Sequence, residues 1–242
     1  MPDAEPKIVL LAGATGLVGK NALDALLEAP DIARVFAVTR RPIGREHPRL
    51  ANRIVQFDTM EAQLKGVTCH VGVCCLGTTI RQAGSQEAFR KVDIDYVLAF
   101  ARTAKAAQAQ RFVVVSSAGA DAQSKNFYLR TKGEMEDALA GVGFVSLDIL
   151  QPGPLMGLRS QMRPLELGLL LVMPLVNPFL RGQREAFRSI SVKTVGAAIV
   201  GATRSGRKGM QRYTHDGIEA LSRLKSVRTV PLVDPRARQR RT

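Results

Sequence analysis

A glycine-rich turn near the start of the chain constrains the fold more than any other feature of the sequence. Its sequence, GATGLVG, lies between a short apolar run at residues 7–12 and a segment with helical spacing at residues 17–28. A strand, a tight turn and a helix in this order leave free backbone N–H groups at the helix start, and glycines let a phosphate approach them. The turn therefore predicts a dinucleotide site. The residues expected to contact the cofactor here are Gly13, Thr15, Gly16, Leu17, Val18 and Gly19.

Short apolar runs recur along the chain and alternate with helical segments. Strands are expected at residues 34–40, 53–57, 70–77, 111–117 and 144–150, and a long helix at residues 85–107. Apolar strands separated by helices predict a parallel sheet that is covered on both faces. The expected fold class is therefore α/β: a Rossmann-type doubly wound parallel sheet with a small C-terminal cap.

No internal repeat or low-complexity linker divides the sequence, so we expect one domain over residues 1–233. Within it, residues 153–188 are rich in proline, glycine, leucine and methionine, and we expect this segment to form a substrate cap over the carboxyl edge of the sheet. Residues 234–242 contain four arginines and are expected to form a basic, disordered tail.

The end of the second expected strand indicates which cofactor is bound. An acidic residue near this point usually accepts hydrogen bonds from the NAD ribose, whereas arginine can pair with the 2′-phosphate of NADP. Arg40 and Arg41 occupy the position and favour NADP(H); the alternative is a surface arginine pair on an arginine-rich protein. Asp58, after the third expected strand, is placed to meet the adenine amino group, and a simple polar strand end is nearly as consistent with it.

A tyrosine and a lysine four residues apart form the candidate catalytic pair. In the sequence YLRTK, Tyr128 and Lys132 fall on one face of a helix, about one turn apart. A nearby ammonium favours the phenolate form of a tyrosine, which makes the phenol usable as a proton donor and acceptor. Chance can produce this spacing. The pair indicates catalysis only because it follows the glycine turn in the sequence.

The chain is strongly basic, with a formal net charge of +14. Its arginines are spread along the sequence and no recognised nucleic-acid motif accompanies them. We therefore expect no specific nucleic-acid partner, and any binding to polyanions should be nonspecific and sensitive to salt.

Cysteine usage and hydropathy indicate the cellular compartment. The three cysteines lie in an apolar run and show no zinc-like arrangement with the histidines, so we expect buried, reduced thiols and no metal site. The first six residues do not resemble a secretory signal. The apolar stretch at residues 164–180 is short and interrupted by prolines, so we expect no membrane span. These features predict a cytoplasmic protein.

As a set, the motifs resemble those of the short-chain dehydrogenase/reductase superfamily in its atypical branch, and more closely those of the Tat-interacting-protein-like oxidoreductases. The similarity covers most of residues 7–165. The motifs occur in the order that this family shows: GATGLVG, RRP, CCLGTT, VDIDYVLAFA, VVVSSAGAD, FYLRTKGEME and QPGPL.

The resemblance implies roles for individual residues. Tyr128 and Lys132 would form the acid–base pair, and Ser117 would orient the substrate oxygen. Ser116 ends the same expected strand, so the choice between the two serines stays open, with Ser117 favoured. Cofactor contacts are implied for Tyr128, Lys132, Leu76, Gly77, Leu155 and Arg163.

The implied function is an NADP-dependent oxidoreductase that acts on a small apolar carbonyl or alcohol compound. The alternative is an NADPH-binding redox sensor or scaffold with little catalysis, which could act with a protein partner or as a homodimer. The Tyr–Lys pair favours the enzyme, but a fold alone does not establish an activity.

Overall fold

The computed structural model describes residues 6–156 and 182–224 of the 242-residue chain. Most of the expected cap, Arg163, the apolar stretch at 164–180 and the basic tail at 234–242 lie outside these residues. Within the described part, no helix is both long and apolar enough to cross a membrane.

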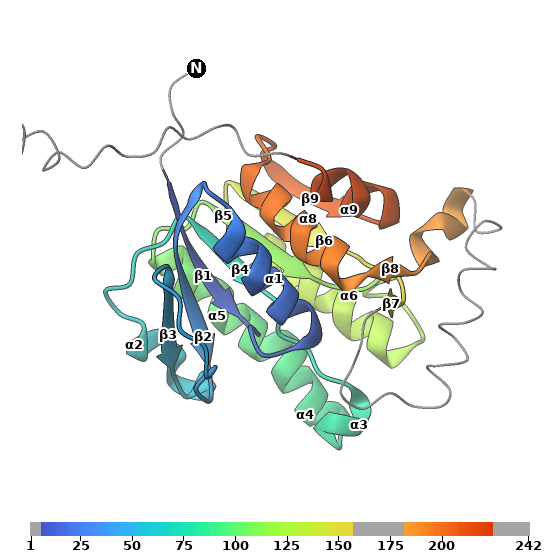
Figure 1. Ribbon diagram of the computed structural model, residues 1–242. Coiled ribbons are helices and arrows are strands. Elements are labelled where there is room, and N and C mark those ends of the chain that lie inside the picture. Colours follow the sequence, from blue (N-terminus) through green and yellow to red (C-terminus); the bar gives the residue numbers. More distant parts are fainter. Residues whose placement is uncertain (1–5, 157–181, 225–242) are drawn as a thin grey trace, which may run out of the picture.

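A seven-stranded sheet forms the centre of the molecule (Figure 1). Its strands lie in the order β3-β2-β1-β4-β5-β6-β9, and every neighbouring pair is parallel. The chain builds outward from β1 in both directions, which places the crossover helices on opposite faces. The doubly wound α/β fold is therefore confirmed. The strands are β1 (Lys7–Ala12), β2 (Ile32–Thr39), β3 (Leu50–Ile54), β4 (Val71–Cys74), β5 (Arg111–Val115), β6 (Ser146–Leu150) and β9 (Gly209–Tyr213).

Helices cover the two faces of the sheet as separate groups (Figure 1). One face carries α1 (Leu17–Glu28), α8 (Val192–Arg204) and α9 (His215–Ser222), which pack on one another in that order. The other face carries α2 (Met60–Gln63), α5 (Tyr96–Ala106) and α6 (Phe127–Ala140).

Two apolar cores fill the space between the sheet and these helices. Successive residues of a strand point to opposite faces. Val9 and Leu11 of β1 accordingly join the core beneath α1 and α8, while Leu10 and Ala12 join the core beneath α5 and α6. All four are fully buried. A strand that is apolar on both faces is what a covered parallel sheet requires.

The third strand begins earlier than the sequence predicts. The apolar run at 53–57 suggested a strand there, whereas β3 ends at Ile54, whose side chain is 55% exposed. Val55 and Phe57 are buried because the chain turns into a short 3-10 helix, η1 (Phe57–Thr59), that packs over the core of the α5 face. The apolar signal came from this packing and not from strand pairing.

The long helix predicted at 85–107 is interrupted. It consists of α4 (Gln86–Arg90), a π-helical turn η2 (Lys91–Asp95) and α5, and it follows the short helix α3 (Ile80–Ala83). Apolar spacing does not reveal a π-turn, which adds one residue to a helical turn and often marks functional sites.

The C-terminal strands belong to two sheets. β9 extends the main sheet, so the chain after α8 is not a separate unit. The described ends of the expected cap form β7 (Leu155–Met156), which pairs with β8 (Ile190–Ser191), and the 3-10 helix η4 (Gly182–Phe187).

Candidate cofactor and catalytic site

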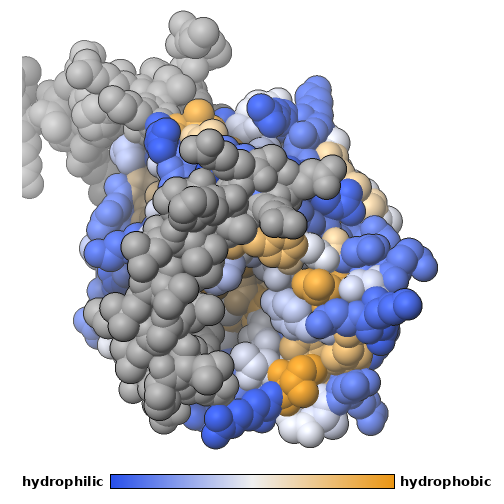
Figure 2. Space-filling view, turned by 90° about the vertical axis from the view of Figure 1, so that its right-hand side faces the viewer, coloured by the Kyte–Doolittle hydropathy of each residue, from blue (hydrophilic) through white to orange (hydrophobic). Residues whose placement is uncertain are grey.

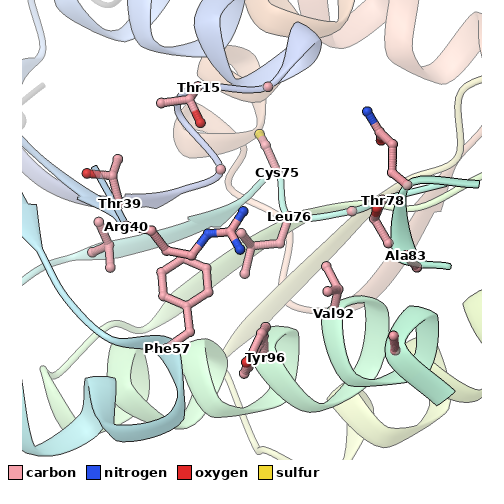
Figure 3. A pocket seen from close by; sticks show the side chains of 16 residues that line it. Thr15, Thr39, Arg40, Phe57, Cys75, Leu76, Thr78, Ala83, Val92 and Tyr96 are labelled. Atoms are coloured by element: carbon pink, nitrogen blue, oxygen red, sulfur yellow. The ribbon is translucent and has the colours of Figure 1, made fainter. Parts of the chain in front are cut away.

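A hollow of about 530 Å³ opens where the strand order reverses, between the ends of β1 and β4. Doubly wound folds bind their ligands at this switch point. The hollow, here called the cofactor hollow, is lined by the glycine turn, the residues that follow β2 and β4, and one side of the α3–α5 segment (Figure 3).

The glycine turn is packed too closely for any side chain at two positions. Gly13 has a φ of +82°, and a Cβ built on it would lie 2.4 Å from the carbonyl oxygen of Cys75. A Cβ on Gly19 would lie 1.9 Å from the carbonyl oxygen of Gly13. Both glycines let β1, α1 and the end of β4 meet, and they leave the start of α1 facing the hollow.

The structure brings half of the residues predicted in this turn to the wall of the cofactor hollow. They are Gly13, Thr15 and Gly16. Leu17, Val18 and Gly19 form the first turn of α1 and do not line the hollow; Val18 and Gly19 are buried. Cofactor contacts from these three residues stay predictions, and Gly19 has a packing role in any case.

The two arginines after β2 differ in position. The Arg40 side chain is exposed and lines the cofactor hollow (Figure 3). Arg41 is exposed but does not line it, and its carbonyl oxygen accepts a hydrogen bond of 2.7 Å from the Thr39 hydroxyl. Arg40 is therefore the better placed of the two to meet an anionic group in the hollow.

Asp58 does not line the cofactor hollow, whereas its neighbour Phe57 does. Its carboxylate accepts a hydrogen bond of 3.2 Å from the Tyr96 hydroxyl and pairs with Lys91 Nζ at 2.8 Å. The hydrogen bond from Lys91 holds the pKa of Asp58 below its usual value. Contact with adenine stays a prediction for this residue.

Leu76 and Gly77, predicted from the CCLGTT motif, both line the cofactor hollow. A Cβ on Gly77 would lie 3.7 Å from Lys132 Nζ and 3.5 Å from Asp93 Oδ1. The ammonium of Lys132 is therefore immediately behind this part of the wall.

Lys132 and Asp93 form a buried ion pair. Lys132 Nζ lies 2.6 Å from Asp93 Oδ1, and the two side chains are 6% and 0% exposed. The backbone N–H of Thr78 donates to Asp93 Oδ2 at 2.9 Å. Burial acts to lower the pKa of Lys132, but the charge of Asp93, with a smaller effect from Tyr128, outweighs it and raises that pKa. Lys132 therefore stays charged while out of water.

Tyr128 lies one turn before Lys132 on α6 and is 36% exposed. Its ring is tilted against that of Phe89, with 5.9 Å between the ring centroids. Asn126 caps the helix just before it by accepting a hydrogen bond from the Leu129 N–H. The phenol therefore has a fixed ring position on a capped helix while remaining accessible to a ligand.

The two candidate serines have different surroundings. The Ser116 hydroxyl is buried and donates to Glu136 Oε1 at 2.5 Å. That carboxylate also accepts hydrogen bonds from Gln151 Nε2 at 2.9 Å and Arg212 Nε at 2.7 Å. Ser117 is half-buried, and its hydroxyl makes a long contact of 3.4 Å with the Ala118 carbonyl oxygen. Ser116 is thus engaged in a buried hydrogen-bond network, while the role of either serine toward a substrate stays a prediction.

The remaining predicted residues lie elsewhere. Leu155 is half-buried on β7, packs against the core of the α1 face and does not line the cofactor hollow. Arg163 lies outside the described residues. Within the described part, no group of three His, Cys, Asp or Glu side chains could hold a metal ion.

Sequence reasoning missed Asp93 and Glu136. Asp93 occurs in the motif VDIDYVLAFA, but spacing alone could not show that the π-turn directs it toward Lys132. Glu136 lies four residues after Lys132, at a spacing that places both on one helix face. That spacing was the available signal for a second inward-facing polar residue.

Comparison with known proteins identifies the family. The model of the HIM1 family matches residues 48–169, half of the chain. The chain belongs to the HIM1 family. Rat protein HTATIP2 is 37% identical over 162 residues, which cover 65% of this chain and 66% of the rat protein. The mitochondrial protein fmp52 of Aspergillus fumigatus is 32% identical over 220 residues, which cover 88% of this chain and 92% of that protein.

Solved structures agree on the fold of this HIM1-family protein. MoeE5 in complex with UDP-glucuronic acid and NAD superimposes with a TM-score of 0.63 at 17% identity, covering 84% of this chain and 74% of MoeE5. The oxidoreductase ylbE of Lactococcus lactis gives 0.62 at 15% identity, covering 91% and 99%. At such low identity these matches show the fold alone. The HIM1-family match and the similarity to HTATIP2 confirm the predicted Tat-interacting-protein-like branch.

The relatives also correct one expectation. Several fungal members, including those of Emericella nidulans at 36% identity and Candida albicans at 35%, are named as mitochondrial proteins. The prediction of a cytoplasmic protein is therefore wrong. Its basis was weak, because burial of Cys69 and Cys74 reflects packing in the sheet and core and does not distinguish compartments.

Proposed function

We propose that this HIM1-family protein binds NADP(H) and uses it to interconvert a carbonyl compound and an alcohol. The observation that supports this most is the position of the Lys132 ammonium, buried behind Gly77 at the cofactor hollow and one helical turn from an accessible Tyr128. Asp93 keeps this lysine charged out of water, and a ribose hydroxyl and the Tyr128 phenol would be its further partners.

The residues present fit a dinucleotide. The glycine turn forms a cradle that a Cβ at Gly13 would fill, and the start of α1 supplies N–H groups for the pyrophosphate. Arg40, with Arg41 beside it, offers guanidinium donors for a 2′-phosphate. When bound, the nicotinamide would supply or accept the hydride.

The chain's own residues would handle the proton and the substrate oxygen. Tyr128 would donate a proton to the oxygen of a carbonyl, or accept one from an alcohol. Lys132 would hold the ribose hydroxyls and favour the phenolate. Ser117 would orient the same oxygen, because Ser116 is engaged by Glu136.

An apolar substrate fits the surroundings of Ser117. Phe187 is 47% exposed, and its ring lies 3.3 Å from a Cβ built on Gly119, two residues after Ser117. On the face that carries α3, α6 and η4, the described surface shows apolar patches among polar residues (Figure 2). An exposed ring against Gly119, two residues after the proposed catalytic serine, favours a hydrophobic carbonyl compound.

A second candidate is an NADPH-dependent binding protein with little catalysis. The observation that favours it is the Asp93 carboxylate, which neutralises Lys132 and thereby weakens the effect of that ammonium on Tyr128. In this case the cofactor would shape a surface for a partner, and the Tyr128 hydroxyl would be dispensable.

The experiment combines calorimetry with a turnover assay on a panel of apolar ketones, aldehydes and alcohols. NADPH should bind more tightly than NADH, and Arg40→Ala/Arg41→Ala should remove that preference, because each charge-assisted contact contributes about 1.5–3 kcal/mol. Tyr128→Phe should keep NADPH affinity while turnover falls by roughly 10²–10⁴-fold.

Each unexpected result of these measurements contradicts a different part of the proposal. Equal affinity of the wild type for the two cofactors would contradict NADP preference. Turnover that Tyr128→Phe leaves unchanged would refute the proposed acid–base role. NADPH binding without turnover on any panel member would favour the binding protein.

A further inference from the structure

A second hollow, of about 720 Å³, lies at the amino edge of the sheet, opposite the cofactor hollow. The starts of β1, β4, β5 and β6 form its floor, and residues 203–208, from the end of α8 to the start of β9, form its other side. Its wall shares no residue with that of the cofactor hollow. We refer to it as the basic hollow because of the side chains described next.

The basic hollow concentrates positive charge. Five of its lining residues are Lys or Arg and none is Asp or Glu: Lys7, Arg111, Arg204, Arg207 and Lys208. Two of these are neutralised from outside the lining, because Arg111 pairs with Asp148 at 2.5 Å and Arg204 pairs with Asp31 at 2.6 Å.

Three cations are left without a carboxylate. Within the described part of the chain, Lys7, Arg207 and Lys208 form no ion pair. Lys7 Nζ donates to the Thr203 carbonyl oxygen at 2.7 Å, and the Arg207 guanidinium lies over the Tyr213 ring. With Arg111 and Arg204 balanced, the hollow keeps an excess of three positive charges in a space bounded by protein.

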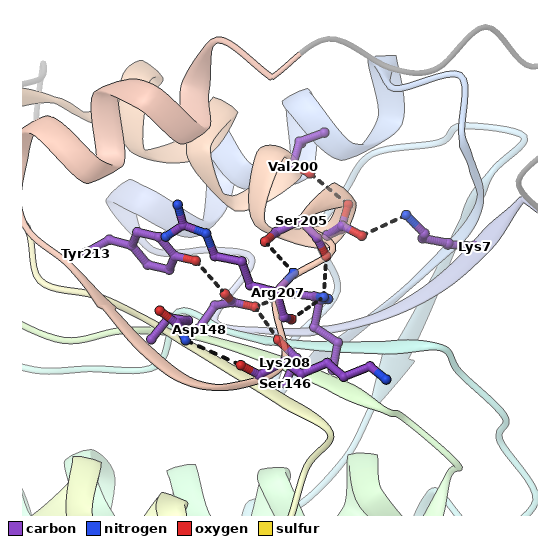
Figure 4. A network of polar contacts seen from close by, with 11 residues as sticks. Lys7, Ser146, Asp148, Val200, Ser205, Arg207, Lys208 and Tyr213 are labelled. Atoms are coloured by element: carbon purple, nitrogen blue, oxygen red, sulfur yellow. Dashed lines mark hydrogen bonds and ion pairs between the residues drawn. The ribbon is translucent and has the colours of Figure 1, made fainter. Parts of the chain in front are cut away.

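A network of hydrogen bonds and one ion pair joins the framework beneath these cations (Figure 4). Asp148 is buried and accepts hydrogen bonds from Tyr213 OH and Ser146 Oγ, each at 3.0 Å, besides its pair with Arg111. The same guanidinium donates to the carbonyl oxygens of Ser205 and Arg207. The backbone of the loop at 205–208 is thereby tied to the sheet edge before any ligand arrives.

Lys7 shows the electrostatic consequence. Its side chain is half-buried, and burial lowers the pKa of Lys7; Asp31 opposes this, while the charges of Arg111 and Arg204 lower it further. An anion bound in the hollow would reduce the repulsion of Lys7 by the two arginines. It would also stand in for the water that burial removes from the Lys7 ammonium.

Neutral polar groups complete the lining. His70 Nδ1 accepts a hydrogen bond of 2.9 Å from the Ile8 N–H, which leaves Nε2–H as a donor in the neutral ring. The side chains of Gln108, Gln110 and Ser205 also line the hollow. Its volume falls within the range of about 300–1,000 Å³ that is usual for small-molecule sites.

We propose that the basic hollow binds a small molecule that carries phosphate groups. Clustered lysine and arginine donors, with hydroxyl and amide groups around them, match the several oxygens and high charge of a phosphate or diphosphate. The site is separate from the cofactor hollow and does not depend on the function proposed above.

The test uses pyrophosphate as the probe and amide chemical shifts as the readout. On titration of the full chain, the amides of residues 68–71, 110–111 and 205–208 should shift together with one dissociation constant. Shifts confined to the glycine turn would place the anion in the cofactor hollow and overturn the proposal. The absence of saturable shifts at the basic hollow would also overturn it.

Charge-removing variants make the test specific. Arg207→Gln and Lys208→Gln alter exposed side chains, so the fold should be kept, and each should weaken pyrophosphate binding about tenfold. Lys7→Gln should weaken it as well. Lys193→Gln removes an exposed lysine on α8 outside the hollow and is the matched control. Equal loss in the control would show a nonspecific field and contradict the site.

Two further arms identify the source of the phosphate. Sedimentation with phosphatidic acid vesicles that Arg207→Gln abolishes would identify a lipid headgroup, whereas pyrophosphate binding without sedimentation would identify a soluble ligand. Either result supports the binding of phosphate groups in the basic hollow. Tight binding to duplex DNA together with no saturable pyrophosphate binding would overturn the proposal in favour of a nucleic-acid surface.

Discussion

At the scale of single residues, the buried ion pair of Asp93 and Lys132 has an energetic consequence that can be measured. Both side chains are out of water, and the separation of 2.6 Å means that each compensates the burial of the other. Removing one partner from a buried pair leaves an uncompensated charge, which costs about 3–5 kcal/mol. The pair therefore sets a large part of the local stability at the wall of the cofactor hollow.

We predict that Asp93→Asn lowers the free energy of unfolding by about 3–5 kcal/mol at pH 7, because the Lys132 ammonium is left buried and unpaired. Asp95→Asn, in the same π-turn but exposed, should change it by less than about 0.5 kcal/mol. Urea denaturation of both variants measures this.

A double variant tests the pairing itself. Asp93→Asn/Lys132→Met removes both charges, so its loss should be smaller than the sum of the two single losses. Additive losses would show that the two groups do not stabilise each other.

At the scale of elements, the packing of α8 against its neighbours depends on small residues. α8 lies between α1 and α9, and a Cβ on Gly201 would lie 1.9 Å from the carbonyl oxygen of Leu221 in α9. A backbone group cannot move aside as a flexible side chain can. Helix propensity and packing therefore oppose each other at this glycine, and packing decides the outcome.

Gly201→Ala should destabilise the protein by about 1–3 kcal/mol, because α9 must shift to admit the methyl group. In an unpacked helix the same change would stabilise by up to about 1 kcal/mol. Gly141→Ala, at the exposed end of α6, meets its nearest contact at 3.5 Å and should have a neutral or slightly stabilising effect. Thermal unfolding of the two variants is the measurement, and equal effects would contradict this account.

At the scale of the whole molecule, burial of thiols couples the fold to pH. Burial raises the pKa of Cys69 and Cys74 to about 12, from 9.0 in the unfolded chain. Above pH 9 the unfolded chain loses protons that the folded chain keeps, so the unfolded state gains stability as pH rises. The resulting contribution to folding is fully present below pH 9 and is lost between about pH 9 and 12.

Melting temperature should therefore fall between pH 9 and 11, measured by circular dichroism under reducing conditions. The Cys69→Ala/Cys74→Ala variant should show a smaller fall over the same window, since it has lost the two titrating groups. The melting temperature of this variant at pH 7 is the reference for its own pH profile. At pH 7 the thiols do not titrate, so any difference from the wild type reflects the changed packing alone. Parallel pH profiles for the two proteins would rule out the thiols as the cause.

The sequence by itself determined that the sheet is parallel and that a glycine turn follows its first strand. These follow from local signals: apolar runs of strand length, helical spacing between them, and glycines at the junction of β1 and α1. Tyr128 and Lys132 belong to the same class, because four residues on a helix fix their relation without reference to the rest of the fold.

Tertiary structure decided what surrounds those residues. The end of β3 at Ile54 depended on the packing of Phe57 against the α5 face, and the direction of Asp93 depended on a π-turn. Neither feature has a periodic signature. The hydrogen bond of Ser116 required Glu136 to arrive from α6, and the basic hollow required four strand starts and a distant loop to meet. Local spacing specifies elements, whereas charge pairing and cavities arise between residues far apart in the chain.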